Sequence, residues 1–244
     1  MSGDLDELFE RVDLCRQKST VLRGEISSLV DVSVKRWVDL VAPGTGQVLA
    51  QLLQHPPVSI RQDIGMIVNE QRAILDALAC RLATRNGANS IADVYFPITS
   101  TKAEFMSGLG RKKLRKISER DRDIIDHFMP WLPSEYDPSE GNLTLFQLHD
   151  ADRVRKHRDL LKWACLGGAF PSGEGYVRSF ISDGVVFSDV GKIERLASFH
   201  EITTQVGVQI NLVYNEPPTL RHHDVSEMLL SFNDVVSEIL SAFA

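Results

Sequence analysis

The sequence predicts an α+β protein, in which a helical core with an N-terminal β-hairpin is followed by a small, mostly antiparallel sheet and a C-terminal helix. Three patterns support this class. Apolar residues in several long stretches recur at three- and four-residue spacing, which is typical of amphipathic helices. Beyond about residue 170, apolar and polar residues alternate, as they do in strands with one buried face. Clusters of proline and glycine separate the stretches and indicate turns.

The N-terminal part reads as two long helices around a hairpin. Residues 5–30 carry one apolar stripe and charged outer faces. The β-prone runs 32–41 and 47–53 flank a Pro/Gly turn, which predicts a hairpin. A pair of prolines then ends the second run, and residues 59–84 form a helix that is apolar on most sides. We expect that helix to be the most buried element.

Shorter elements follow. Residues 95–98 form an extended piece, because proline disfavours helical backbone in the residue before it. Ser118 begins a capping box and predicts a helix to about Phe128. The next amphipathic helix is expected over 143–165, and Gly167-Gly168 is expected to break the chain after it.

The C-terminal part reads as strands and one helix. Asp183-Gly184 has the composition of a hairpin turn, and residues 224–243 carry the stripe of a final amphipathic helix. The expected strands are 176–181, 185–187, 193–199 and 208–214. The domain prediction is therefore a helical core with an inserted hairpin over 1–168 and a small sheet with a closing helix over 169–244, or one continuous domain.

Composition excludes several classes of protein. The chain is 43% hydrophobic and 25% charged, with a net charge of −6, which argues mildly against a dedicated nucleic-acid binder. No apolar run reaches the roughly 18 residues that span a bilayer, and the acidic N-terminus lacks the apolar core of a signal peptide. Cys15, Cys80 and Cys165 are isolated, so no disulfide framework is expected. These features predict a cytoplasmic protein with no membrane partner.

The most informative stretch is 148–158, where charged residues and histidines interrupt an apolar stripe. On the predicted helix Arg158 lies on the stripe that faces the core. An unpaired buried charge is very costly, so we expect this cation to have a partner. Arg72 and Asp76, spaced i,i+4 on the second long helix, are neighbours on one face.

Two interpretations of these residues stay open. In the structural one, Asp76 pairs with Arg158 or Arg155 and Arg72 faces Asp150 or Asp152, as a buried salt-bridge network between two helices. In the functional one, His157 supplies acid–base chemistry and the surrounding cations hold a phosphate or carboxylate. That set is adequate for metal-independent RNA cleavage or for anion binding alone. The candidate catalytic residues are Arg72, Asp76, His149, Arg153, His157 and Arg158, with Lys156 beside them.

A basic cluster at 111–116 is the main electrostatic anomaly in this acidic chain. Its members are Arg111, Lys112, Lys113, Arg115 and Lys116. Such a cluster can contact RNA or DNA phosphates. It has no interleaved aromatic residues on which bases could stack, and a solvated surface is the competing interpretation.

No metal or cofactor is expected. His149 with Asp150 and Asp152, and the run 222–224, contain ligand types without a recognised ligand spacing. The glycines match no phosphate-binding or dinucleotide-binding motif.

Three patches of the chain resemble a family of bacterial proteins with no established activity. The family combines a leucine-arginine-x-alanine-leucine-aspartate helix, a phenylalanine-proline-isoleucine element, and a helix that begins with leucine-histidine and ends with lysine-histidine-arginine. The matching positions are Arg72, Leu75, Asp76, Leu78, Phe96-Pro97-Ile98, Leu148-His149 and Lys156-His157-Arg158. The resemblance implies a shared fold type and a bacterial origin. Asn69 and Ala77 replace histidines of the family, and Arg155 replaces an acid, which favours the structural interpretation.

A weaker resemblance links the stretch Arg153 to His157 to HEPN-type helical ribonucleases, whose motif spaces an arginine and a histidine slightly further apart. The leading functional interpretation is a cytoplasmic protein that binds or interacts with a partner through its charged helical core. The alternatives are a metal-independent HEPN-like ribonuclease and a nucleic-acid-binding module that uses 111–116. The partner is open between RNA and another protein, and a homodimer through the first or last helix is compatible with the same patterns.

Overall fold

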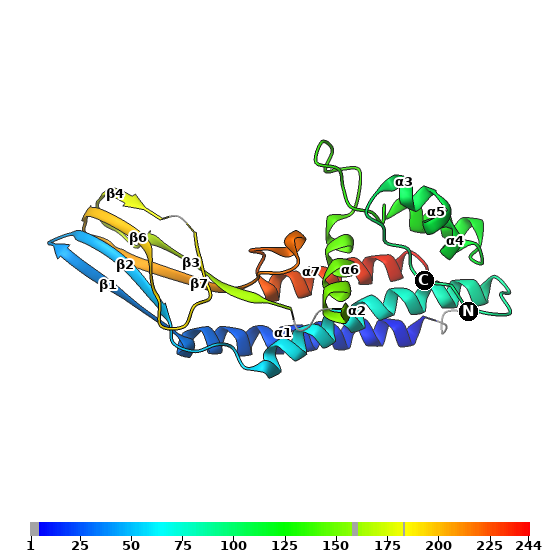
Figure 1. Cartoon of the computed structure of the whole chain (residues 1–244), viewed down its shortest axis with the longest axis horizontal. Coiled ribbons are helices and arrows are strands. Elements are labelled where there is room, and N and C mark those ends of the chain that lie inside the picture. The colour runs from blue at the N-terminus through cyan, green and yellow to red at the C-terminus, as the bar shows by residue number, and fades with distance from the viewer. Residues whose placement is uncertain (1–4, 158–160, 183) are drawn as a thin grey trace. The chain divides into compact units, whose positions relative to one another are not determined.

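The computed structural model describes residues 5–157, 161–182 and 184–244, without the side chains of Leu109 and His157. It confirms the α+β class (Figure 1). By their contacts the residues form two compact units. We call them the helical unit (Met1–Thr20, Asp63–Leu160 and Glu227–Ala244) and the sheet unit (Val21–Gln62 and Leu161–Ser226).

Seven α-helices occur over the described residues, and the first, second and last of them agree with the predicted ranges. The helices are α1 (Asp6–Ser33), α2 (Val58–Arg85), α3 (Lys102–Met106), α4 (Gly108–Leu114), α5 (Glu119–His127), α6 (Leu143–His157) and α7 (Val225–Ser241). The predicted cap is confirmed, because the Ser118 hydroxyl accepts a hydrogen bond from the Asp121 amide at the start of α5. The sequence did not predict α3 and α4, which are short and lack a long stripe.

The core of the helical unit is built on α2, as its apolar sequence predicted. Leu75 and Leu78 of α2 are fully buried, together with Leu8 of α1, Leu148 of α6 and Phe232 of α7. Ion pairs reinforce the edges of this core. Arg11 of α1 pairs with Glu70 of α2, and Arg16 of α1 pairs with Asp234 of α7.

The sheet unit contains two antiparallel sheets. One has the strand order β1-β2-β6-β4 and the other β5-β3-β7. Their strands are β1 (Val34–Ala42), β2 (Thr45–Leu52), β3 (Trp163–Ser172), β4 (Val177–Ile181), β5 (Val185–Phe187), β6 (Ile193–Ile202) and β7 (Gln205–Tyr214). The sheets pack closely, because a Cβ on Gly167 of β3 would lie only 2.7 Å from the Leu196 side chain of β6. Only glycine fits at that position without displacing a neighbour.

The hairpin β1-β2 forms as predicted, but it is not an insertion in the helical core. β2 pairs with β6 from Gly46 opposite Phe199 to Gln51 opposite Ile193, so the hairpin completes a sheet with strands that come much later in the chain. Alternate residues of β2 are buried, as in a strand that turns one face of its sheet towards the core.

Two sequence predictions between 143 and 187 are wrong. The helix expected to reach Cys165 ends at His157, and Cys165 and Gly167-Gly168 lie within β3. The short apolar run of β3 also matches helical spacing, and periodicity alone does not separate a strand from a helix in so short a run. The hairpin expected at Asp183-Gly184 does not form, because β4 pairs with β6 whereas β5 pairs with β3; Asp183 itself lies outside the described residues.

Across the described residues, no helix combines the length and the apolar character that crossing a membrane requires.

Candidate functional site

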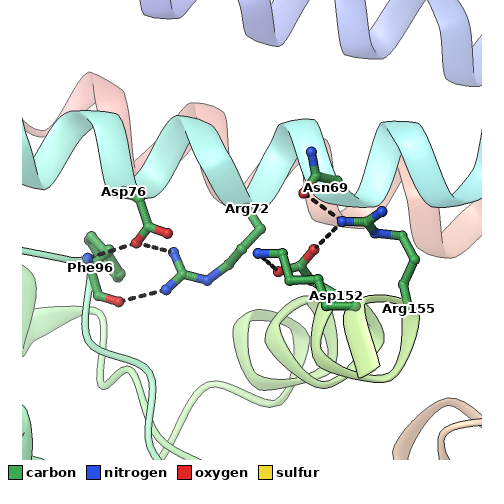
Figure 2. Close-up of polar contacts among 7 residues, drawn as sticks. Asn69, Arg72, Asp76, Phe96, Asp152 and Arg155 are labelled. Atoms are coloured by element: carbon green, nitrogen blue, oxygen red, sulfur yellow. Dashed lines mark hydrogen bonds and ion pairs between the residues drawn. The ribbon is translucent and has the colours of Figure 1, made fainter. Parts of the chain in front are cut away.

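The centre of the candidate site is Arg72, a buried arginine that joins α2 to the segment before α3. One terminal nitrogen of its guanidinium donates to Asp76 Oδ1 at 2.7 Å, and the other donates to the carbonyl of Phe96 at 2.8 Å (Figure 2). The Phe96 amide donates in turn to Asp76 Oδ1 at 3.0 Å. The Arg72–Asp76 pair therefore satisfies both backbone groups of a fully buried residue, which otherwise would lack partners.

The acidic residues of α6 are satisfied mainly within their own helix. Asp150 accepts from Arg153 at 2.5 Å, and Asp152 accepts from Lys156 at 2.6 Å and from Arg155 at 3.4 Å. Both carboxylates are buried. Each cation lies three or four residues further along, where side chains on one helix face meet.

The contact between α2 and α6 differs from the predicted one. Arg155 donates to the side-chain oxygen of Asn69 at 2.7 Å, so a neutral amide takes the place of the expected Asp76 (Figure 2). Asp76 bonds instead to Arg72 and to the Phe96 backbone. The i,i+4 pair Arg72–Asp76 is confirmed, whereas the cross-helix pairing of Arg155 with Asp76 is wrong. Sequence spacing identifies neighbours within one helix but not the rotation of two helices against each other.

A second group of polar side chains gathers around His149 of α6. Arg72 of α2 and Lys113 of α4 are close enough for their charges to act on its imidazole. Burial, together with these two cations, lowers the pKa of His149 to about 4, against weaker opposing effects of Asp152 and Asp150. At neutral pH the His149 ring is therefore uncharged.

Lys113 is the unusual member of this group. Its side chain is half-buried, and among the described residues it has neither an ion pair nor a hydrogen bond. Burial and the positive charge of Arg72 lower the pKa of Lys113, and Asp76 opposes them. A half-buried cation beside a second cation is unfavourable unless something compensates it.

The cations and carboxylates around His149 differ in how they are paired. Arg72 pairs with Asp76, and the carboxylates of Asp150 and Asp152 pair with cations of α6. Lys113 is the cation near His149 that makes no ion pair among the described residues. Its positive charge is therefore the one that a bound anion could balance.

The basic cluster 111–116 does not form one continuous patch. Arg111 makes two hydrogen bonds to the Asp126 carboxylate, and Lys116 donates to the carbonyls of Ser90 and Ala92. Lys113 is half-buried and close enough to His149 for its charge to act on the imidazole, so Lys112 and Arg115 are the two members left exposed without a described partner. Its use as a nucleic-acid interface stays a prediction.

The ion pair of Arg111 with Asp126 is expected to contribute modestly to folding. Both side chains are about one-third exposed. Replacing Arg111 by methionine should lower the free energy of unfolding by about 1 kcal/mol in urea denaturation. A loss several times larger would mean that Arg111 holds α4 in place by more than this pair.

Three remaining predictions concern His157 and Arg158, a metal site, and the cysteines. His157 ends α6, but its side chain and the whole of Arg158 lie outside the described residues. Within the described part of the chain, no cluster of three metal-ligating side chains occurs. Burial raises the pKa of both Cys15 and Cys165 to about 11, so these two thiols are poor nucleophiles.

Sequence reasoning missed two contributions to the site. The Phe96 backbone is a partner that no side-chain pattern reveals, although the Phe-Pro-Ile resemblance marks the segment. Lys113 was grouped with its basic neighbours, and the sequence pattern gave no reason to separate it from them. Its placement on α4 is what directs it towards α6.

Comparisons of the chain with protein-family models, with curated proteins and with solved structures found no match.

Proposed function

We propose that this protein is a binding protein, and that its helical unit takes up a phosphate group of its ligand at Lys113, Arg72 and His149. The observation that carries the proposal is the half-buried ammonium group of Lys113, which has no ion-pair partner among the described residues. A bound phosphate would supply the missing negative charge. It would also accept charge-assisted hydrogen bonds from the Lys113 ammonium and the Arg72 guanidinium.

Arg72 and His149 suit such a ligand for different reasons. Arg72 uses two of its five donors on Asp76 and Phe96, so further N–H groups remain for an anion. His149 is neutral at physiological pH and offers one ring N–H without adding a buried charge. Arg72 is held on both sides by Asp76 and Phe96, so its guanidinium is oriented before a ligand arrives.

The low pKa of His149 favours binding over acid–base catalysis. With a pKa of about 4, the imidazole is not in its acidic, doubly protonated form at pH 7 and is a weak base. A metal-independent ribonuclease would need another acid–base group, for which the sequence offers His157. RNA cleavage is therefore the competing result in the experiment below.

We expect wild-type protein to bind inorganic phosphate in isothermal titration calorimetry and a short single-stranded RNA in fluorescence anisotropy. Replacing Lys113 by methionine should raise the Kd for phosphate about tenfold, because one charge-assisted contact is lost. The matched control is Lys112→Met, which removes the same charge from an exposed neighbour and should leave the Kd unchanged. Equal affinities for wild type and Lys113→Met, or no phosphate binding at millimolar concentration, would contradict the proposal.

The same RNA, labelled at one end, reports cleavage on a denaturing gel. We expect the strand to stay intact in the presence and in the absence of a chelator. Cleavage that persists with chelator and disappears in His157→Ala would replace the binding function by a nuclease function.

A further inference from the structure

Strand β1 is an unusually exposed edge strand. It lies at the end of the sheet order β1-β2-β6-β4, so its outer backbone edge has no strand partner in the described part of the sheet unit (Figure 1). The strand is nine residues long, and only Val34 at its start is buried. Proteins commonly shorten, bend or cover such edges, because free N–H and C=O groups pair readily with another strand.

Both faces of β1 carry exposed apolar side chains. Val38 and Leu40 lie opposite Val48 and Gly46 of β2, on the sheet face that is buried along β2. Yet Val38 is 46% exposed and Leu40 is 62% exposed. The inner face of the sheet is therefore apolar but uncovered at β1. A further strand beside β1 would continue this apolar face.

We infer that β1 is a homodimer interface, at which β1 of a second copy of this chain pairs with it in the antiparallel direction. A two-fold axis perpendicular to the sheet keeps the faces of the two copies aligned, so one residue of β1 must lie opposite itself. The pairing is then decided by which residue lies on the axis.

Placing Trp37 on the axis gives a complementary register. Lys35 then lies opposite Asp39 of the other copy, twice by symmetry, and Val34 lies opposite Leu40. Directly opposite residues share a face of an antiparallel pair, so these side chains meet. The two aromatic rings lie opposite each other at the centre, each with its own Lys35 ammonium 5.3 Å from the ring centroid.

The neighbouring registers of the β1–β1 pair bring together less favourable side chains. Placing Lys35, Arg36 or Asp39 on the axis brings two like charges face to face. Placing Val38 on the axis sets Trp37 against Asp39 and Arg36 against Leu40, without any charge pair. The sequence of β1 therefore selects the Trp37 register by charge.

Arg36 does not prevent this association. An inward-facing charge can protect an edge strand, but Arg36 is paired with Asp31 of its own chain. In the Trp37 register it lies opposite Val38, where its aliphatic stem can cover the apolar side chain while the guanidinium keeps its own partner.

Charge reversal on the full-length protein tests the register. Sedimentation velocity over about a hundredfold range of concentration should show a monomer–dimer equilibrium for wild type. Lys35→Glu and Asp39→Lys should each raise the dimer Kd about tenfold, because two attractive pairs become repulsive. The double variant Lys35→Glu/Asp39→Lys should return the Kd to within about threefold of wild type.

Lys18→Glu is the matched control, since it reverses an exposed lysine on α1 and should leave the dimer Kd unchanged. Circular dichroism of each variant verifies that the fold persists. Because there are two single variants, the register can still be tested if one of them fails to fold. Three results would overturn the inference: a wild-type chain that stays monomeric throughout, a dimer unaffected by either reversal, and a double variant that fails to recover.

Discussion

Replacing Arg72 by methionine is expected to lower the free energy of unfolding by about 3 kcal/mol. The substitution keeps most of the apolar volume but removes the donors that Asp76 and the Phe96 carbonyl use. Phe96 is fully buried, so its carbonyl has no access to water as a replacement partner. Asp76 is partly exposed and regains some hydration, which keeps the loss at the lower end of the range for buried ion pairs.

Urea denaturation followed by circular dichroism measures this loss. Arg16→Met is the matched control in the same unit, because Arg16 and its partner Asp234 are both largely exposed. That control should change the free energy of unfolding by no more than about 0.5 kcal/mol. If Arg72→Met were as stable as Arg16→Met, the Arg72–Asp76 pair would not be holding the Phe96 segment. The burial of the Arg72 guanidinium would then need a functional explanation.

Most of the helical fold could be predicted from the sequence because the signal is local. The apolar spacing of α2, the Ser118 cap and the Arg72–Asp76 neighbour pair each depend on residues within one or two turns. The hairpin β1-β2 was predicted for the same reason, since its Pro/Gly turn joins two adjacent runs.

The parts that could not be predicted depend on tertiary contacts. Nothing within 34–52 indicates that β2 pairs with β6, about 150 residues later. The strand β3 resembled a helix because its short apolar run fits helical spacing as well as strand spacing. In the site, the missing information was which side chains meet: Asn69 instead of Asp76 at Arg155, and Lys113 at His149.

The second large effect is a pH dependence of stability that comes from His149. Its pKa in the folded protein is about 4, below the ordinary value of 6.5 that the unfolded chain has. The folded state thus binds fewer protons, and folding favours the neutral ring. The contribution is complete above pH 6.5 and is lost as the pH falls towards 4. The loss reaches at most about 3 kcal/mol, since each pKa unit corresponds to about 1.4 kcal/mol.

Comparing wild type with His149→Gln isolates this contribution, because carboxylates that titrate in the same range are common to both proteins. The variant should lose less free energy of unfolding than wild type between pH 6.5 and 4, and the difference between the two proteins should stop changing above pH 7. Urea denaturation at several pH values measures it. If the free energies of unfolding of wild type and His149→Gln differed by the same amount at every pH in this range, His149 would not be held neutral by its surroundings.

Lys113→Met links the stability effect to the proposed binding site. Removing this cation takes away one cause of the lowered pKa of His149, so the pKa should rise and the acid loss of stability should shrink. Bound phosphate should act in the same direction, because a negative charge beside the ring favours its protonated form. An NMR titration of His149, with and without phosphate, tests whether the anion binds beside this ring. If phosphate raises the pKa of His149 in wild type, the anion binds beside this ring; if it leaves the pKa unchanged, the positive charge of Lys113 serves some other contact.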